Sequence, residues 1–198
     1  MTPPIGKDSI STAMSTLGIT RYEANQLDAL DGKTDGKIKK DIFTEAQELL
    51  ASTKEQYAND TEDHSNEPID VNGSKVSHAI AASIAKVAGY GGYVFNKKEN
   101  KELTEEEWEL AEEVGEVCSD ADDYVDENGT IKGFKAEIPG NVTAINIQHE
   151  KFANPEESNY ATFGANGQAQ VENGGVITRS NYTTANGEEY ELGYIWGV

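Results

Sequence analysis

The stretch TRYEANQLDALDGKTDGKIKKDIFTEAQELLA, residues 20–51, decides the fold of the first part of the chain. Glu23 follows Thr20 by three residues, which is the spacing of a capping box. This pattern predicts the start of a helix. After a loop rich in Asp, Gly and Lys, apolar residues return at helical spacing and mark one face of a second helix. These residues are Ile38, Ile42, Phe43, Ala46, Leu49 and Leu50. The pattern predicts a helix–loop–helix.

The loop between these two helices resembles the calcium-binding loop of the EF-hand family. Such loops supply oxygen ligands from positions 1, 3, 5, 7 and 12 and have glycine at position 6. Asp31 matches position 1, Asp35 matches position 5 and Gly36 matches position 6. The resemblance implies that the backbone carbonyl of Lys37 serves at position 7. It also implies that Ile38, at the apolar position 8, forms a short strand, as it does in paired hands.

Two positions of this loop depart from the EF-hand pattern. Lys33 stands at position 3, where an oxygen ligand is expected, and Ile42 replaces the bidentate glutamate of position 12. The resemblance therefore implies the fold of a hand with reduced affinity for Ca²⁺.

A second stretch, FNKKENKELTEEEW at residues 95–108, carries a weaker resemblance to the same loop. Here Asn96, Asn100 and Glu107 would match positions 1, 5 and 12. Lysines occupy position 3 and the glycine position, and a glycine-rich segment precedes the stretch. The alternative is an ordinary helix start, because Thr104 and Glu107 form another capping box.

A third stretch, DADDYVDENGTIKGF at residues 120–134, concentrates oxygen donors. The candidate ligands are Asp120, Asp122, Asp123, Asp126 and Asn128. Carboxylates at this density repel one another, and a divalent cation would relieve that repulsion. The alternative is a solvated acidic turn.

The last part of the chain has the pattern of an antiparallel β-meander. Asn-Gly, the strongest short hairpin signal, occurs at 166–167, 173–174 and 186–187. Strands are predicted near 142–149, 158–165, 168–172, 175–184 and 188–196. Tyr190, Leu192, Tyr194 and Trp196 alternate along the last strand, and we expect them to form its buried face.

These patterns together predict an α+β fold in four regions. Residues 1–52 form an EF-hand-like helical region, and 53–70 an acidic linker in which His64 is interpreted as a solvated side chain. Residues 71–136 form a second helical region. It contains one helix over 74–89, a second helix that begins at Thr104, and an acidic loop after that second helix. Residues 137–198 form the antiparallel β region. Cys118, the one cysteine, is interpreted as a small apolar residue packed on a helix.

Composition excludes several classes of function. Acidic residues outnumber basic ones 36 to 16, for a formal net charge of −20. Clustered basic residues, which nucleic-acid binding requires, are not found, so we expect no binding to DNA or RNA. No apolar stretch predicts a membrane span or a signal peptide, which favours a soluble protein. The common catalytic motifs are not found either, so an enzyme is not expected.

Two classes of function remain after these exclusions. The first is a non-enzymatic, calcium-binding, EF-hand-like protein with a structural or interaction role, whose partner is another protein. The second is a structural or assembly component, such as a surface, appendage or virion protein, without a specific ion. An acidic decoy for a basic protein is a further alternative, because a polyanionic surface attracts basic partners. The sequence leaves the oligomeric state and the compartment open.

Overall fold

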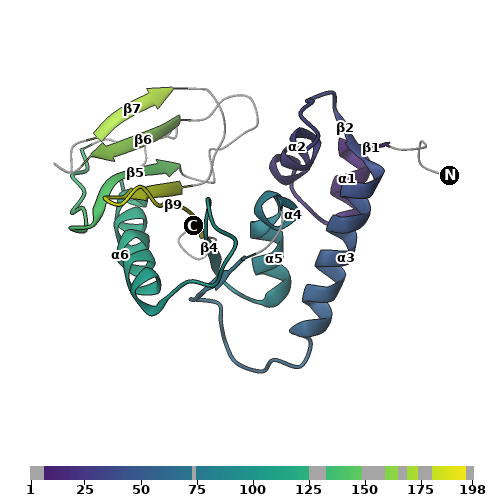
Figure 1. Cartoon of the computed structure of the whole chain (residues 1–198), viewed down its shortest axis with the longest axis horizontal. Helices are drawn as coiled ribbons and strands as arrows, with labels where there is room; N and C mark the ends of the chain where they lie inside the picture. The colour runs from purple at the N-terminus through teal and green to yellow at the C-terminus, as the bar shows by residue number, and fades with distance from the viewer. Residues whose placement is uncertain are drawn as a thin grey trace. The chain divides into compact units, whose positions relative to one another are not determined.

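The computed structural model describes residues 7–72, 75–124, 133–148, 159–164, 169–173 and 180–194. The chain divides into two compact units, Met1–Tyr93 and Val94–Val198. The first unit is largely helical, and the second holds most of the strands (Figure 1), which confirms the α+β class. The division falls inside the segment 71–136, which the sequence pattern predicted to be one helical region.

The first unit is built around the predicted helix–loop–helix. Its elements are β1 (Lys7–Ser9), α1 (Ile10–Leu17), α2 (Arg21–Ala29), β2 (Lys37–Lys39), α3 (Lys40–Gln56), β3 (Pro68–Asp70), α4 (Lys75–Ala79) and α5 (Ala81–Ala88). Both halves of the capping box at Thr20 and Glu23 are present, so the predicted start of α2 is confirmed. The second helix extends five residues further than expected, to Gln56 rather than Ala51.

A short strand at Ile38 closes the loop of this helix–loop–helix. β2 pairs antiparallel with β1, and Ile38 is opposite Asp8. The Ile38 side chain is fully buried. The strand expected at Ile38 is therefore formed, and its partner is the segment that leads into α1.

The single helix predicted over 74–89 is divided into two. α4 ends at Ala79, and Ile80, with φ −121°, precedes α5. Gly89 caps the end of α5, and its φ of 82° lies in the left-handed region that glycine adopts without a Cβ penalty. α3 packs against both short helices, and Figure 1 shows it running alongside them. Because α3 contacts both, the break does not separate them from the core of the first unit.

The second unit packs one long helix against an antiparallel sheet. Its elements are α6 (Glu105–Asp122), β5 (Val142–Gln148), β6 (Asn159–Gly164), β7 (Ala169–Asn173), β8 (Ser180–Thr184) and β9 (Glu189–Tyr194), and β4 (Gly92–Asn96) crosses the boundary between units. Within this unit the strand order is β4-β9-β8-β5-β6-β7. The five predicted strands are all present, but β8 pairs with β5 rather than with β7.

The core of the second unit lies between α6 and the sheet. Buried residues include Val114, Cys118, Ile145, Tyr182 and Leu192. Cys118 is fully buried on α6, as expected for a small apolar residue.

The buried face predicted for the last strand is confirmed where the structure describes it. Tyr190 and Leu192 are buried, and Tyr190 stacks on Tyr182 across the β8–β9 hairpin. The side chain of Tyr194 and the whole of Trp196 lie outside the described residues. Among the described helices, none has the length and apolar character needed to cross a membrane.

Candidate metal sites

Asp28 places a buried carboxylate beneath the loop of the helix–loop–helix. It lies in the last turn of α2 with 4% of its surface exposed. Its Oδ2 accepts a hydrogen bond from the Gly36 N–H at 2.8 Å. Its Oδ1 is buried and has no hydrogen-bond partner. A buried acceptor without a partner is costly unless a proton or a cation satisfies it.

Two further carboxylates, those of Asp31 and Asp35 in the loop itself, also accept hydrogen bonds from backbone N–H groups. Asp31 accepts the Lys33 N–H on Oδ1 at 2.9 Å, and its Oδ2 is buried without a hydrogen-bond partner. Asp35 accepts the Lys37 N–H on Oδ1 at 3.1 Å. Backbone amides thus hold one oxygen of each carboxylate and fix its orientation.

The local electrostatics disfavour three negative charges without a counter-ion. Burial raises the pKa of Asp28 above its ordinary value, the hydrogen bond from Gly36 opposes that rise, and the nearby Asp35 and Asp31 carboxylates add to it. A cation bound at this point would remove both the burial cost and the repulsion.

The EF-hand pattern in the sequence did not predict Asp28 as a candidate ligand. It assigned position 1 to Asp31, and Asp28 lies one helical turn earlier, inside α2. The available signal was the spacing of three residues, which places the two side chains near one another at a helix end. At positions 3 and 12 of the EF-hand pattern, Lys33 is exposed and Ile42 is half-buried on α3. Lys37 lies in β2, opposite Ser9.

The candidate ligands of the second stretch do not lie in a helix–loop–helix. The segment that should form the entering helix is strand β4, and Asn96 is its last residue. The Oδ1 of Asn96 accepts the N–H groups of Lys98 and Glu99, and its Nδ2 donates to Glu188. Asn100 is exposed in the following turn.

Glu107 caps the helix that follows this turn. Together with Thr104 it forms the capping box that starts α6, and it accepts a further hydrogen bond from the Tyr190 hydroxyl. Burial would raise the pKa of Glu107, but the bonds from Tyr190 and Thr104 outweigh it and hold the pKa below its ordinary value. The helix-start alternative therefore accounts for Glu107.

The third stretch lies partly outside the described residues. α6 continues to Asp122, so Asp120 and Asp122 are helical, and Asp123 is the residue that ends the helix. Asp120 and Asp123 are exposed. Asp126 and Asn128 fall between residues 125 and 132, which the structure does not describe.

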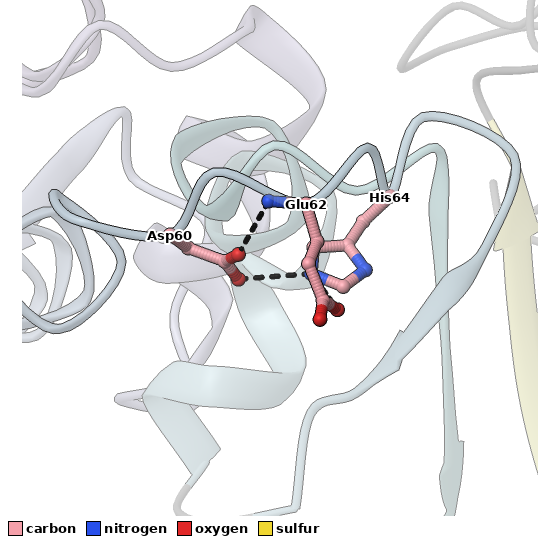
Figure 2. A group of neighbouring side chains, drawn as sticks. All are labelled: Asp60, Glu62 and His64. Atoms are coloured by element: carbon pink, nitrogen blue, oxygen red, sulfur yellow. Dashed lines mark hydrogen bonds and ion pairs between the residues drawn. The ribbon is translucent and has the colours of Figure 1, made fainter.

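A different group of metal-ligating side chains lies on the loop that follows α3. Asp60, Glu62 and His64 each place a ligand atom within 4.8 Å of the others. The His64 Nε2 is 2.8 Å from an Asp60 oxygen and 3.8 Å from a Glu62 oxygen. Figure 2 shows the Asp60 carboxylate directed at the ring of His64. The expectation that His64 is a solvated side chain in a linker is wrong: its side chain is 12% exposed and lies among these carboxylates.

The ring of His64 is held from its other sides as well. Its Nδ1 is 2.8 Å from a Glu67 oxygen, and Tyr90 stacks on it with 4.4 Å between ring centroids. Its backbone carbonyl accepts the N–H groups of Glu67 and Gly91. The sequence did carry a signal for this cluster, the alternation Asp-x-Glu-x-His. What it could not reveal was the contact with Tyr90.

No family model, curated protein or solved structure matches this chain.

The His64 cluster leads to a prediction on pH. The hydrogen bond to Glu67 raises the pKa of His64 most, burial opposes that rise, and Asp60 adds to it. A raised folded-state pKa means that the stabilisation is fully present below the ordinary value of about 6.5 and is lost as the pH rises through the folded-state pKa. In the metal-free protein, the ring protons of His64 followed by NMR should titrate above 6.5.

Glu67→Gln supplies the control for this titration, because the amide keeps an acceptor for Nδ1 and removes the charge. The midpoint of His64 should move down in this variant. A wild-type midpoint at or below the ordinary value would contradict the hydrogen bonds from His64 to Glu67 and Asp60.

Proposed function

We propose that this chain is a non-enzymatic protein that binds Ca²⁺ in the loop between α2 and α3 and serves a structural or interaction role. The observation that carries the proposal is the Oδ1 of Asp28, a carboxylate oxygen that is buried, has no hydrogen-bond partner and lies beside two other carboxylates. Ca²⁺ is a hard cation that prefers carboxylate, carbonyl and water oxygens.

The backbone around these carboxylates supports the proposal. Gly36 has φ 79°, a left-handed conformation that allows the sharp turn and directs its N–H at Asp28. The Gly36 carbonyl accepts the N–H of Ile10, and the β1–β2 pairing holds the end of the loop. The loop is therefore fixed by contacts of its own and does not need an ion to keep its shape.

The ligand set also sets the expected strength of binding. Ca²⁺ takes six to eight oxygens, and three aspartates supply only part of that number. No carboxylate stands at Ile42, where an EF-hand has its bidentate glutamate. Water would complete the coordination, so we expect an affinity below that of a complete hand. The formal charge of −20 adds a favourable long-range field for cations.

Calorimetric titration of Ca²⁺ into chelator-treated protein tests the proposal directly. Wild-type protein should show saturable binding with a stoichiometry near one, and Asp28→Asn should abolish it. Asp41→Asn is the matched control, because Asp41 is an exposed aspartate at the start of α3 and loses the same charge. Magnesium, which demands a tighter octahedral shell, should give a weaker response.

The competing location is the acidic stretch after α6. Asp126→Asn should leave Ca²⁺ binding unchanged if the loop between α2 and α3 holds the ion. Binding that disappears in Asp126→Asn and survives in Asp28→Asn would overturn the proposal. So would the absence of saturable heat in the wild-type protein.

A further inference from the structure

We propose a second metal site of different chemistry, in which Asp60, Glu62 and the Nε2 of His64 bind a divalent transition-metal ion such as Zn²⁺. The site lies on the loop after α3 and shares no residue with the loop between α2 and α3. It rests on the arrangement of these side chains and is independent of the proposed binding of Ca²⁺.

The spacing of the ligand atoms fits a metal of this size. Zn²⁺ binds nitrogen and carboxylate oxygen at about 2.0–2.2 Å, so two ligands of a tetrahedral ion lie about 3.3 Å apart. The two distances from the His64 Nε2, 2.8 Å to Asp60 and 3.8 Å to Glu62, lie on either side of that value. Shifts of about half an ångström would bring both oxygens to the required separation.

Glu67 acts as a positioning residue for the histidine. Metal-bound histidines commonly donate their other ring N–H to a carboxylate, which fixes the tautomer and the orientation of the ring. The Nδ1 of His64 is 2.8 Å from a Glu67 oxygen, so its proton is held there. This bond leaves the Nε2 of His64 as the metal ligand, on the side where Asp60 and Glu62 lie.

The ring is also held in place before any metal arrives. Tyr90 stacks on it with 1° between the ring planes, and Tyr57 meets Tyr90 edge to face. Two backbone N–H groups bind the carbonyl of His64. Fixing a ligand in advance lowers the entropy cost of binding, and an exposed acidic cluster on a loop without such contacts lacks that advantage.

The imidazole decides the class of metal. Ca²⁺ and Mg²⁺ take oxygen ligands, whereas imidazole suits Zn²⁺ and other divalent ions of the first transition row. When the metal binds a doubly protonated His64, the Nε2 proton leaves to solvent and the metal takes its place between His64 and Asp60. Three protein ligands leave the remaining coordination positions to water.

Titration of Zn²⁺ and Co²⁺ into the full chain tests this site. The titration should be done at a pH above the measured midpoint of His64, where the ring is neutral and can bind a metal. Binding of Co²⁺ should produce a visible absorption band. Glu62→Gln removes a ligand whose side chain is 81% exposed, so the fold should not change. Glu48→Gln, at an exposed glutamate of α3, is the matched control.

We expect Glu62→Gln to weaken Zn²⁺ binding at least tenfold and Glu48→Gln to leave it unchanged. Glu67→Ala, which removes the acceptor for Nδ1, should weaken it about 10–100-fold through the loss of orientation, and Glu67→Gln, which keeps an acceptor, should weaken it less. Asp28→Asn should leave Zn²⁺ binding intact, which separates this site from the proposed Ca²⁺ site. Equal affinity in the Glu62→Gln and Glu48→Gln variants, or no saturable binding to the wild-type chain, would overturn the proposal.

Discussion

Asp28→Asn is expected to stabilise the calcium-free protein and to abolish its stabilisation by Ca²⁺. The substitution removes a buried charge that lies beside Asp31 and Asp35, and it adds an amide that can donate a hydrogen bond. Satisfying a buried polar group of this kind changes the free energy of unfolding by about 1–3 kcal/mol. The denaturation midpoint of the chelator-treated variant should therefore exceed that of the wild-type protein.

Ca²⁺ should offset this difference by stabilising the wild-type protein. A ligand that binds only the folded state at a hundred times its dissociation constant adds about 2.7 kcal/mol to the free energy of unfolding. Wild-type protein and the Asp41→Asn control should both gain that amount, and Asp28→Asn should gain nothing. Sodium chloride of equal ionic strength separates screening from binding. The mechanism fails if sodium reproduces the gain, or if Asp28→Asn keeps it.

Leu192→Ala is expected to reduce the free energy of unfolding of the second unit by about 2–5 kcal/mol. Leu192 has 1% of its surface exposed and belongs to the core between α6 and the sheet. Its Cδ2 would lie 3.9 Å from a Cβ placed on Gly115, so the side chain fills the space where α6 approaches β9. Alanine would leave a cavity that the neighbours fill only in part.

Chemical denaturation followed by tyrosine and tryptophan fluorescence would measure this loss. Val87→Ala is the control, because Val87 is an apolar residue with 38% of its surface exposed on α5. Substitutions at exposed positions change stability by about 0.5 kcal/mol or less. Equal losses in the two variants would mean that Leu192 does not lie in a tightly packed core.

Local signals in the sequence predicted most of the elements correctly. The capping boxes at Thr20 and Thr104 marked the starts of α2 and α6, because each uses hydrogen bonds within one helical turn. The Asn-Gly pair at 186–187 marked the β8–β9 hairpin, where Gly187 has φ 85°. Such signals are reliable because the groups that interact are a few residues apart in the chain.

The second candidate loop, at residues 95–108, shows why matching residues to the positions of a loop pattern does not by itself identify a metal site. Their spacing suggested that Asn96 and Glu107 are ligands in one loop. In the structure, Asn96 is the last residue of a strand and Glu107 caps a helix. A twelve-residue loop pattern indicates an EF-hand only where helices precede and follow it. The strand β4 before Asn96 is decided by pairing within a sheet, which a local pattern does not contain.

The sequence by itself determined the α+β class, the helix–loop–helix at residues 20–51 and the strands near the end of the chain, because hydrophobic period and turn residues act locally. Only the tertiary structure decided that β8 pairs with β5 and that Asp28 lies buried beside Asp35. Only the tertiary structure, too, brought Tyr90 onto the ring of His64. These contacts join residues that are distant in the chain or lie on different elements, and burial, which changes the chemistry of a carboxylate or an imidazole, exists only once the chain has folded.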